Sequence, residues 1–177
     1  MAAILALAGS NSSTSINFKL VQFTTSLIDG HQIQQLNMTY YPFPMYSADD
    51  EKQKGYSNSL IELKNDFQKA DGVILSVNEH NGNPSAYFKN VLDWLSRLER
   101  KFLQDKKVLL MSTSGGKRGG IGSLGVVQDM LPRFGADIIS TFSLPSFSEN
   151  FGPEGITNDE LKNQHKVALD AFLKTLK

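Results

Sequence analysis

The chain has 177 residues, of which 40% are hydrophobic and 20% are charged, and its formal net charge is zero. This length and composition predict one folded domain over residues 1–177, and the neutral charge argues against a protein that mainly binds nucleic acid or an anionic membrane. Because the chain contains no cysteine, disulfides, thiolate metal sites and a cysteine nucleophile are excluded, and a cytoplasmic location is expected.

An apolar run, residues 2–8 (AAILALA), lies near the start of the chain. No basic segment precedes it and it is short for a signal peptide, so it predicts a strand buried on both faces. No later stretch approaches the roughly 20 apolar residues of a membrane-spanning helix. The next apolar residues have the spacing of one helix face and lead to a helix stop at Asp29-Gly30: Ile16, Leu20, Phe23 and Leu27.

Short apolar runs alternate with helical patterns along the rest of the chain. Further strands are predicted at residues 33–36, 72–77, 108–111 and 138–142. Further helices are predicted from the apolar residues within 56–67, 88–98, 124–134 and 161–176. We expect the helix over 88–98 to begin after Pro84, and the last helix to begin at a capping box of Thr157 and Glu160. This alternation predicts an α/β fold, a three-layer α/β/α sandwich around a parallel sheet.

In such a fold, ligands bind at the carboxyl ends of the strands, so the loops after the first, third and fourth strands form the candidate site. The first loop, GSNSSTSIN at residues 9–17, has four serines, one threonine and no charge. It leads into a helix, whose N-terminus could hold a phosphate through unpaired backbone N–H groups without any lysine. The alternative is a helix cap, which requires only one of these side chains: Ser10, Ser12, Ser15 and Asn17.

The residues that the first loop and the second strand lack limit which anion the site could bind. The loop has one glycine, Gly9, and no lysine before Lys19, so neither a Walker-type loop nor the glycine fingerprint of dinucleotide folds is present. The end of the second strand, residues 36–38, carries no acid to hold a ribose. Nucleoside triphosphates and Rossmann-bound NAD are therefore disfavoured.

The second loop contains NEHNG, residues 78–82. Glu79 and His80 could form an acid–base pair or half of a metal site, or His80 could have a stacking or polar packing role. His31 and His165 are expected on solvent-facing segments, so no metal-ligand set is completed. The following helix carries a structural or subunit-contact face: Asp93, Trp94 and Arg97.

The third loop, STSGGKRGGIGS at residues 112–123, has five glycines. Glycines permit unusual backbone angles and the close approach of a flat ligand, although a tight connection into the next helix is the alternative. Lys117 and Arg118 could attract a phosphate or could simply be solvated.

Together, the three loops resemble those of the NADPH-dependent FMN reductase family, in the flavodoxin-like superfamily. The family's phosphate loop, G-S-x-S-x-x-S-x-N, matches residues 9–17, and its P-E-Y-N-G-like turn followed by K-N-x-x-D-W-x-S-R matches NEHNG and KNVLDWLSR, residues 89–97. Its glycine-rich S-x-G-G…G-G segment matches residues 114–120. The chain departs from the family pattern at Asn78, where proline is common, and at His80, where tyrosine is common.

The resemblance implies a flavodoxin-like sheet in the order 2-1-3-4-5 and an FMN cofactor, with NADPH or NADH as co-substrate. It implies that FMN carries hydride to a small-molecule acceptor such as a flavin, quinone, azo dye or chromate, without a catalytic side chain or a metal. It also implies a homodimer or homotetramer through an exposed apolar face on residues 87–98. The implied FMN contacts are Ser10, Ser12, Ser13, Ser15, Ile16, Asn17, Asn78, Glu79, His80, Asn81, Gly82, Ser114, Gly115 and Gly116.

Two other functions remain open from the residues. The chain could be a non-enzymatic, flavodoxin-like electron carrier, although such carriers tend to be acidic and this chain is neutral. It could also be a flavodoxin-like regulatory domain without cofactor. Visible absorbance of bound flavin and turnover of NADPH distinguish the three.

Overall fold

The computed structural model describes residues 1–176, and its centre is a five-stranded sheet in the order β2-β1-β3-β6-β7. All four neighbouring pairs run parallel. The strands are β1 (Ala3–Ala8), β2 (Gln32–Leu36), β3 (Gly72–Val77), β6 (Lys107–Thr113) and β7 (Asp137–Leu144). Since β6 and β7 are the fourth and fifth strands that the sequence predicts, the expected order 2-1-3-4-5 is confirmed.

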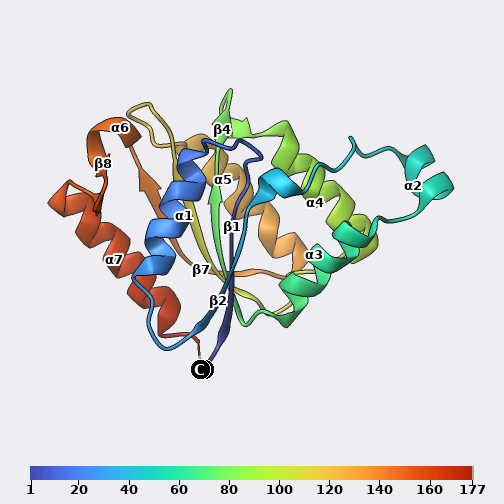
Figure 1. Ribbon diagram of the computed structural model, residues 1–177, viewed down its shortest axis with the longest axis horizontal. Helices are drawn as coiled ribbons and strands as arrows, with labels where there is room; N and C mark the ends of the chain where they lie inside the picture. Colours follow the sequence, from blue (N-terminus) through green and yellow to red (C-terminus); the bar gives the residue numbers. More distant parts are fainter. Residues whose placement is uncertain (177) are drawn as a thin grey trace.

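Helices cover both faces of the sheet, as Figure 1 shows in a view along its edge. One face is covered by α1 (Ile16–Ser26) and α7 (Asp159–Leu173). The other is covered by α3 (Asn58–Lys69), α4 (Ala86–Leu98) and α5 (Ile121–Met130). The predicted three-layer sandwich is therefore confirmed.

The central strands are buried on both faces because successive side chains point to opposite sides of a strand. In β1, Leu5 and Leu7 belong to the core under α3, α4 and α5, whereas Ile4 and Ala6 belong to the core under α1 and α7. Each of these side chains is at most 1% exposed. This two-sided burial explains why the strand reads as a continuous apolar run.

The structure corrects one predicted helix start and confirms another. The last helix is capped by Asn158, whose side chain accepts from the backbone N–H of Leu161, and not by Thr157. The helix after β3 begins after Pro84, as predicted, and is capped by Ser85, whose hydroxyl accepts from the backbone N–H of Phe88. At the last helix, Asn158 next to the predicted Thr157 has the extended backbone and the side-chain acceptor that an N-cap requires.

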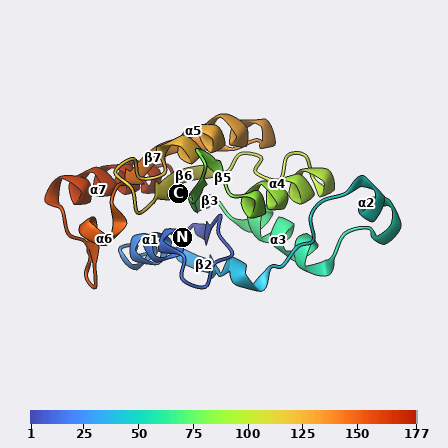
Figure 2. The same cartoon turned by 90° about the horizontal axis from the view of Figure 1, so that it is seen from above.

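Several short elements have no apolar pattern in the sequence. They are the helices α2 (Ala48–Lys54) and α6 (Phe147–Asn150), the 3₁₀ turn η1 (Met38–Tyr40) and two hairpins, whereas the 3₁₀ turn η2 (Leu131–Phe134) lies within the helix predicted over 124–134, which ends in the structure at Met130. The hairpins are formed by β4 (Glu79–His80) with β5 (Asn83–Pro84), and by β8 (Phe151–Gly152) with β9 (Gly155–Ile156). Figure 2 shows α2 at one end of the molecule, away from the sheet.

The expectation that His165 faces solvent is wrong. His165 is 1% exposed and packs between α7 and α1, where its Nε2 lies 2.8 Å from the Thr24 hydroxyl. The rings of Phe23 and Phe142 lie 5.4 Å and 5.1 Å from the imidazole. His31 is half-buried, and its Nδ1 accepts from the backbone N–H of Ala2.

The expectation of an exposed apolar face on residues 87–98 is also wrong for this chain by itself. Trp94 of α4 is 5% exposed, because Tyr46 and Tyr56 pack edge-on against its ring. Its indole N–H donates to the carbonyl of Pro44 at 2.8 Å. The segment around α2 therefore covers this helix face.

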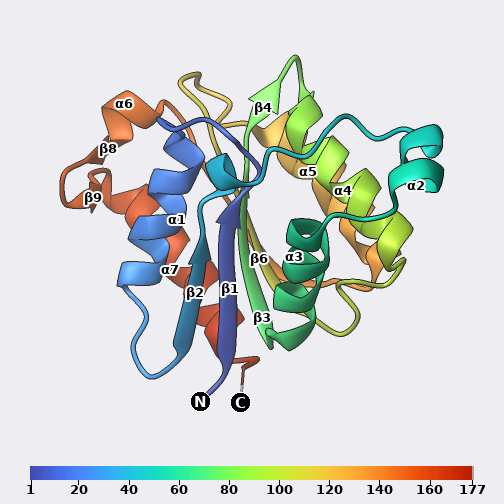
Figure 3. The same ribbon diagram turned by 45° about the vertical axis from the view of Figure 1, so that its right-hand side comes forward.

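The carboxyl ends of the sheet strands meet at one edge of the molecule, where Figure 3 shows the β4 hairpin and the loop after β1. The N-terminus lies at the opposite edge (Figure 3). Among residues 1–176, no helix has the length and apolar character needed to cross a bilayer.

Candidate functional site

A cleft of about 280 Å³ opens at the carboxyl edge of the sheet, between the loops after β1, β3 and β6. These are the three loops in which the sequence placed the site. The lining residues are Ser10, Ser12, Thr14, Ser15, Ile16, Asn17, Asn78, Glu79, His80, Thr113, Ser114 and Gly115.

Most of the predicted site residues therefore come together in one place. Four of them, Ser13, Asn81, Gly82 and Gly116, do not line the cleft. Two residues that line it, Thr14 and Thr113, were not predicted. Thr14 belongs to the same hydroxyl-rich loop and could have been included on that pattern, whereas Thr113 ends a buried strand and gives no local signal.

The loop after β1 is shaped by hydrogen bonds between its own residues. The Ser10 hydroxyl accepts from the N–H of Ser12, and the Ser12 hydroxyl accepts from the N–H of Thr14. Ser15 is the N-cap of α1, and its hydroxyl accepts from the N–H of Phe18. The serines therefore stabilise a turn that leads directly into the helix.

The same loop leaves backbone donors free. The N–H groups of Ser13, Ile16 and Asn17 have no hydrogen-bond acceptor among residues 1–176. Ile16 and Asn17 are the first two residues of α1, an 11-residue helix, so their N–H groups lie at the positive end of the helix dipole. Free N–H groups in this position form a binding site for an anion.

The buried side chain of Asn17 connects the three loops of the site. It is 2% exposed, and its Oδ1 accepts from the Thr113 N–H at 3.0 Å and from the Ser76 hydroxyl at 2.8 Å. Its Nδ2 donates to the Thr113 carbonyl at 3.1 Å. One amide thus joins the first turn of α1 to the ends of β3 and β6, which fixes the relative positions of the three loops.

The second wall of the cleft is the hairpin β4–β5. Asn81 and Gly82 form its two-residue turn with φ angles of 54° and 78°, the left-handed values that an Asn-Gly turn supplies readily. The tip is exposed, whereas Asn78 and Glu79 are half-buried at the base. The base, and not the tip, therefore faces the cleft.

Glu79 ties this hairpin to the N-terminus of α5. Its Oε2 accepts from the Ser123 N–H at 2.9 Å, and the Ser123 hydroxyl donates to the Asn78 carbonyl at 2.8 Å. The N-cap of α5, Gly120, has no side chain to provide this bond. Gly122 leaves room for the contact, since a Cβ there would lie 2.7 Å from Glu79 Oε2.

The amide of Asn78 is incompletely bonded. Its Nδ2 lies 3.4 Å from Nε2 of His80, which is exposed. Its Oδ1 is buried and has no hydrogen-bond partner among residues 1–176. A buried acceptor without a partner is rare in folded proteins, and an absent ligand is one of its ordinary explanations.

The third wall is the loop after β6. Gly119 and Gly120 have φ angles of 59° and 76°, and the Ser112 hydroxyl donates to the Gly119 carbonyl. A Cβ on Gly119 would collide with the Ser143 hydroxyl, so the loop packs closely against β7. Lys117 and Arg118 are exposed and do not line the cleft.

The cleft is nearly free of ionisable side chains. Glu79 and His80 are the titratable residues that line it. The larger pKa shifts lie elsewhere: hydrogen bonds from Arg97, Tyr46 and Tyr56 lower the pKa of Glu51 to about 2. Among residues 1–176, no three His, Cys, Asp or Glu side chains gather as metal ligands. The cleft can therefore bind and orient a ligand through neutral donors.

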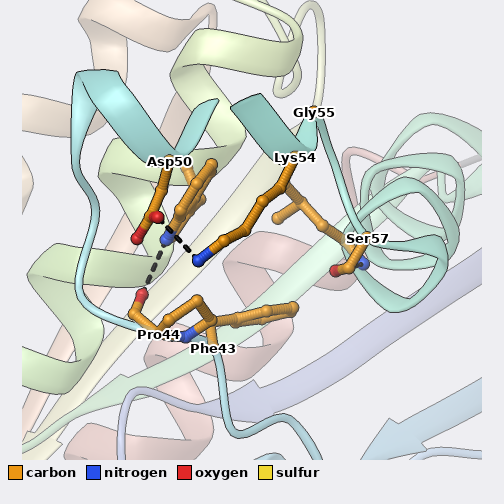
Figure 4. Close-up of a pocket in the computed structure, with 8 residues that line it drawn as sticks. Phe43, Pro44, Asp50, Lys54, Gly55 and Ser57 are labelled. Atoms are coloured by element: carbon orange, nitrogen blue, oxygen red, sulfur yellow. Dashed lines mark hydrogen bonds and ion pairs between the residues drawn. The ribbon is translucent and has the colours of Figure 1, made fainter. Parts of the chain in front are cut away.

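A second cavity of about 170 Å³ lies beside α2 and shares no residue with the cleft. Phe43, Pro44, Leu60 and Trp94 give it apolar walls. Figure 4 shows Asp50 and Lys54 at its rim, where they form an ion pair of 2.7 Å.

The fold and the cleft define a doubly wound α/β protein whose cleft lies at the switch point of its sheet, beside free N–H groups of a helix N-terminus. A family model, that of the NADPH-dependent FMN reductases, matches residues 2–148, and the chain belongs to this family. The family inferred from the three loops is therefore confirmed, and with it an oxidoreductase family that uses FMN.

Individual relatives agree with this family. A quinone reductase of Escherichia coli (strain K12) is 36% identical over 77 residues, which are 44% of this chain and 41% of that protein. The match thus spans less than half the length of that relative. The NADPH:quinone oxidoreductase of Arabidopsis thaliana is 29% identical over 187 residues, 96% of this chain and 90% of that protein.

The fold has close counterparts among solved structures. The flavoenzyme NAD(P)H:(acceptor) oxidoreductase of Paracoccus denitrificans superposes with a TM-score of 0.77 at 20% identity, and 100% of each chain is covered. At this identity the similarity concerns the fold alone.

Two independent observations show that the residues of the cleft suit FMN. The free N–H groups of Ile16 and Asn17, two residues that line the cleft, suit a phosphate monoester, which accepts hydrogen bonds and carries negative charge. The unpartnered Oδ1 of Asn78, in the second loop of the same cleft, suits a flat ring that carries N–H donors.

Proposed function

We propose that this protein is an FMN-dependent oxidoreductase that transfers hydride from NADPH or NADH, through bound FMN, to a small-molecule acceptor such as a quinone or a flavin. The observation that carries the proposal is the group of free N–H donors at the start of α1, which lies in one cleft with the hairpin and the glycine-rich loop. Family membership supports the choice of cofactor and of reaction class.

In this proposal the loop after β1 holds the FMN phosphate, with donors from Ser13, Ile16 and Asn17 and from the nearby serine hydroxyls. No lysine or arginine is required, because the N-terminus of α1 supplies the positive end of a dipole. Asn17 contributes indirectly as well, because its side chain fixes the loop against β3 and β6.

The hairpin base and the glycine-rich loop would then flank the ring. Asn78, Glu79 and His80 lie on one side of the cleft, and Thr113, Ser114 and Gly115 on another. When bound, FMN supplies the redox chemistry, accepting hydride from the nicotinamide and passing the electrons on to the acceptor. The chain's own role is to position the cofactor and to exclude water, so no nucleophile or general base is required.

The test is to purify the protein, record its visible spectrum with and without added FMN, and measure NADPH and NADH oxidation with a quinone. Flavin absorbance together with turnover by the protein alone supports the proposal. Bound flavin without turnover would indicate an electron carrier, and absence of flavin after FMN is added would indicate a domain without cofactor.

We also propose that the protein forms a homodimer, or a homotetramer built from such dimers, through the surface around α2. Met45 and Tyr40 on this surface are large apolar side chains that are 68% and 79% exposed. They lie in the same segment as Phe43 and Pro44, which line the apolar cavity of Figure 4. Such a surface fits an interface between two copies.

Sedimentation analysis of the wild type and of two variants tests this assembly. We expect Met45→Glu to dissociate the dimer, because it would bury a charge at the contact. Leu27→Glu, at a 50% exposed position on the other side of the sheet, is the matched control and should leave assembly unchanged. A monomeric wild type, or a dimer that tolerates Met45→Glu, would contradict the proposal.

The single-domain organisation and the cytoplasmic location stay predictions of the sequence.

A further inference from the structure

The side chain of Asn78 contains a buried oxygen, Oδ1, that has no hydrogen-bond partner among residues 1–176. No other side chain that lines the cleft has such an atom among these residues. The neighbours of Asn78 do not supply a partner. The Ser123 hydroxyl donates to the carbonyl of Asn78, and the Ser123 N–H donates to Glu79. The backbone at Asn78 is thus fixed, while the end of its amide remains open.

Turning the Asn78 amide over would not provide the missing hydrogen-bond partner. As described, Nδ2 lies 3.4 Å from Nε2 of His80 and Oδ1 is buried. If the amide were turned by half a rotation, Oδ1 would face His80 and Nδ2 would take the buried position without an acceptor. In either orientation one hydrogen-bonding atom of Asn78 is unused inside the protein.

In the orientation described, Nδ2 of Asn78 faces Nε2 of His80 at 3.4 Å. An Nδ2–H group donates to an unprotonated Nε2, which requires that the imidazole proton be on Nδ1. With Nδ2 held in this way, the buried atom is Oδ1, an acceptor. The group that satisfies it must therefore be a donor.

We propose that Oδ1 of Asn78 accepts a hydrogen bond from a ring N–H of bound FMN, and that His80 is a positioning residue that holds the amide in this orientation. This inference rests on the proposed function, because it needs FMN in the cleft. It gives Asn78 a direct part in binding the ring, and it explains why a buried acceptor is kept at the base of the hairpin.

The stability of the protein without FMN separates a ligand contact from a structural one. The buried Oδ1 contributes no hydrogen bond to folding, and the contact of Nδ2 with the exposed His80 ring is long, at 3.4 Å, so Asn78→Leu should unfold at the same temperature as the wild type or higher. A structural bond at Oδ1 would instead make the variant less stable. We expect unchanged or raised stability without FMN, together with weaker FMN binding.

FMN binding is measured by the quenching of FMN fluorescence on titration with the flavin-free protein, and the midpoint potential of the bound flavin by spectroelectrochemistry. We expect Asn78→Leu to raise the Kd by about three- to tenfold if the N–H is present in the oxidised ring, the range for one neutral hydrogen bond. If the N–H forms only on reduction, the midpoint potential falls instead. Asn83→Ala, an exposed amide on the same hairpin, is the matched control and should change neither quantity.

The role of His80 is tested by a double-mutant cycle with His80→Phe, which keeps an aromatic ring and removes the nitrogen. If His80 acts through Asn78, His80→Phe weakens FMN binding in the wild type and has no further effect in Asn78→Leu. Equal weakening in both backgrounds would show that His80 contacts the ring independently and would overturn the positioning role.

Two results would overturn the inference about Asn78 while leaving the proposed function intact. One is a wild type that binds FMN and an Asn78→Leu variant with the same Kd and the same midpoint potential. The other is a variant that loses stability without FMN, which would assign Asn78 to the fold. Failure of the wild type to bind FMN at all would overturn the proposed function and this inference together.

Discussion

Glu79 Oε2 accepts a hydrogen bond from the backbone N–H of Ser123 at 2.9 Å, so a side chain of the β4 hairpin caps a helix that begins about 40 residues later. The sequence suggested an acid–base or metal role for this carboxylate. The contact gives it a structural role, because it joins two walls of the cleft.

We predict that Glu79→Ala lowers the free energy of unfolding by about 1 kcal/mol, the usual effect of losing an N-cap. Glu79→Gln should retain part of this stability, because its amide oxygen can still accept from Ser123. Urea unfolding of both variants measures the difference. If Glu79→Ala were as stable as the wild type, the bond to Ser123 would not contribute to the fold.

The phosphate site can be tested at a single backbone atom. Ile16 is the first residue of α1, a position where proline is well tolerated, and Ser15 before it has φ −55° and ψ 116°, which suit a residue preceding proline. Ile16→Pro therefore removes one free N–H without breaking the helix. We expect FMN to bind about ten- to a hundredfold more weakly, the effect of one charge-assisted hydrogen bond.

Ile16→Ala is the control for this change, because it shortens the side chain and keeps the N–H. Fluorescence titration with FMN compares the two, and circular dichroism checks that both are folded. Equal affinity in Ile16→Pro and Ile16→Ala would mean that this N–H does not contact the phosphate.

Asn17 should matter for stability as well as for binding. Replacement by alanine leaves the N–H of Thr113 and the hydroxyl of Ser76 without their partner, at positions that are at most 1% exposed. We predict a loss of about 2–4 kcal/mol in unfolding free energy without FMN, because buried donors left unpaired are expensive. Asn11→Ala, an exposed residue of the same loop, should have almost no effect in the same urea experiment.

The parts of this fold that the sequence predicts are those with a local signal. The buried strands are continuous apolar runs, and the three loops of the cleft follow directly from their order in a doubly wound sheet. The three loops could therefore be assigned to one site before their contacts were known. The Asn-Gly pair of the hairpin also carries its own turn preference.

The parts that the sequence does not predict depend on contacts between distant segments. Asn17 and Thr113 are 96 residues apart, and nothing near either residue indicates their hydrogen bonds. The helix α2 has no buried residue, and is held instead by Glu51, which pairs with Arg97 at 3.0 Å. The sequence does not indicate this ion pair, so it does not predict that the segment around α2 covers the indole of Trp94.

His165 gives the pH dependence of stability. Burial lowers the pKa of His165 to about 4 from an ordinary value of 6.5. Below pH 6.5 the unfolded chain therefore takes up a proton that the folded chain does not, so stability is complete above pH 6.5 and falls as the pH drops toward 4. The loss reaches about 3 kcal/mol at the lower end of this window.

Urea unfolding without FMN at pH 7.5 and at pH 5 measures this effect, and His165→Phe is the variant that isolates it. Phenylalanine keeps an aromatic ring between Phe23 and Phe142, and the Thr24 hydroxyl still donates to the carbonyl of Leu20. We expect the variant to lose most of the difference in stability between the two pH values. Glu51, with its pKa lowered to about 2, changes stability only below its ordinary value of 4.5 and so does not interfere. A pH difference that persists in His165→Phe would assign the effect to another group.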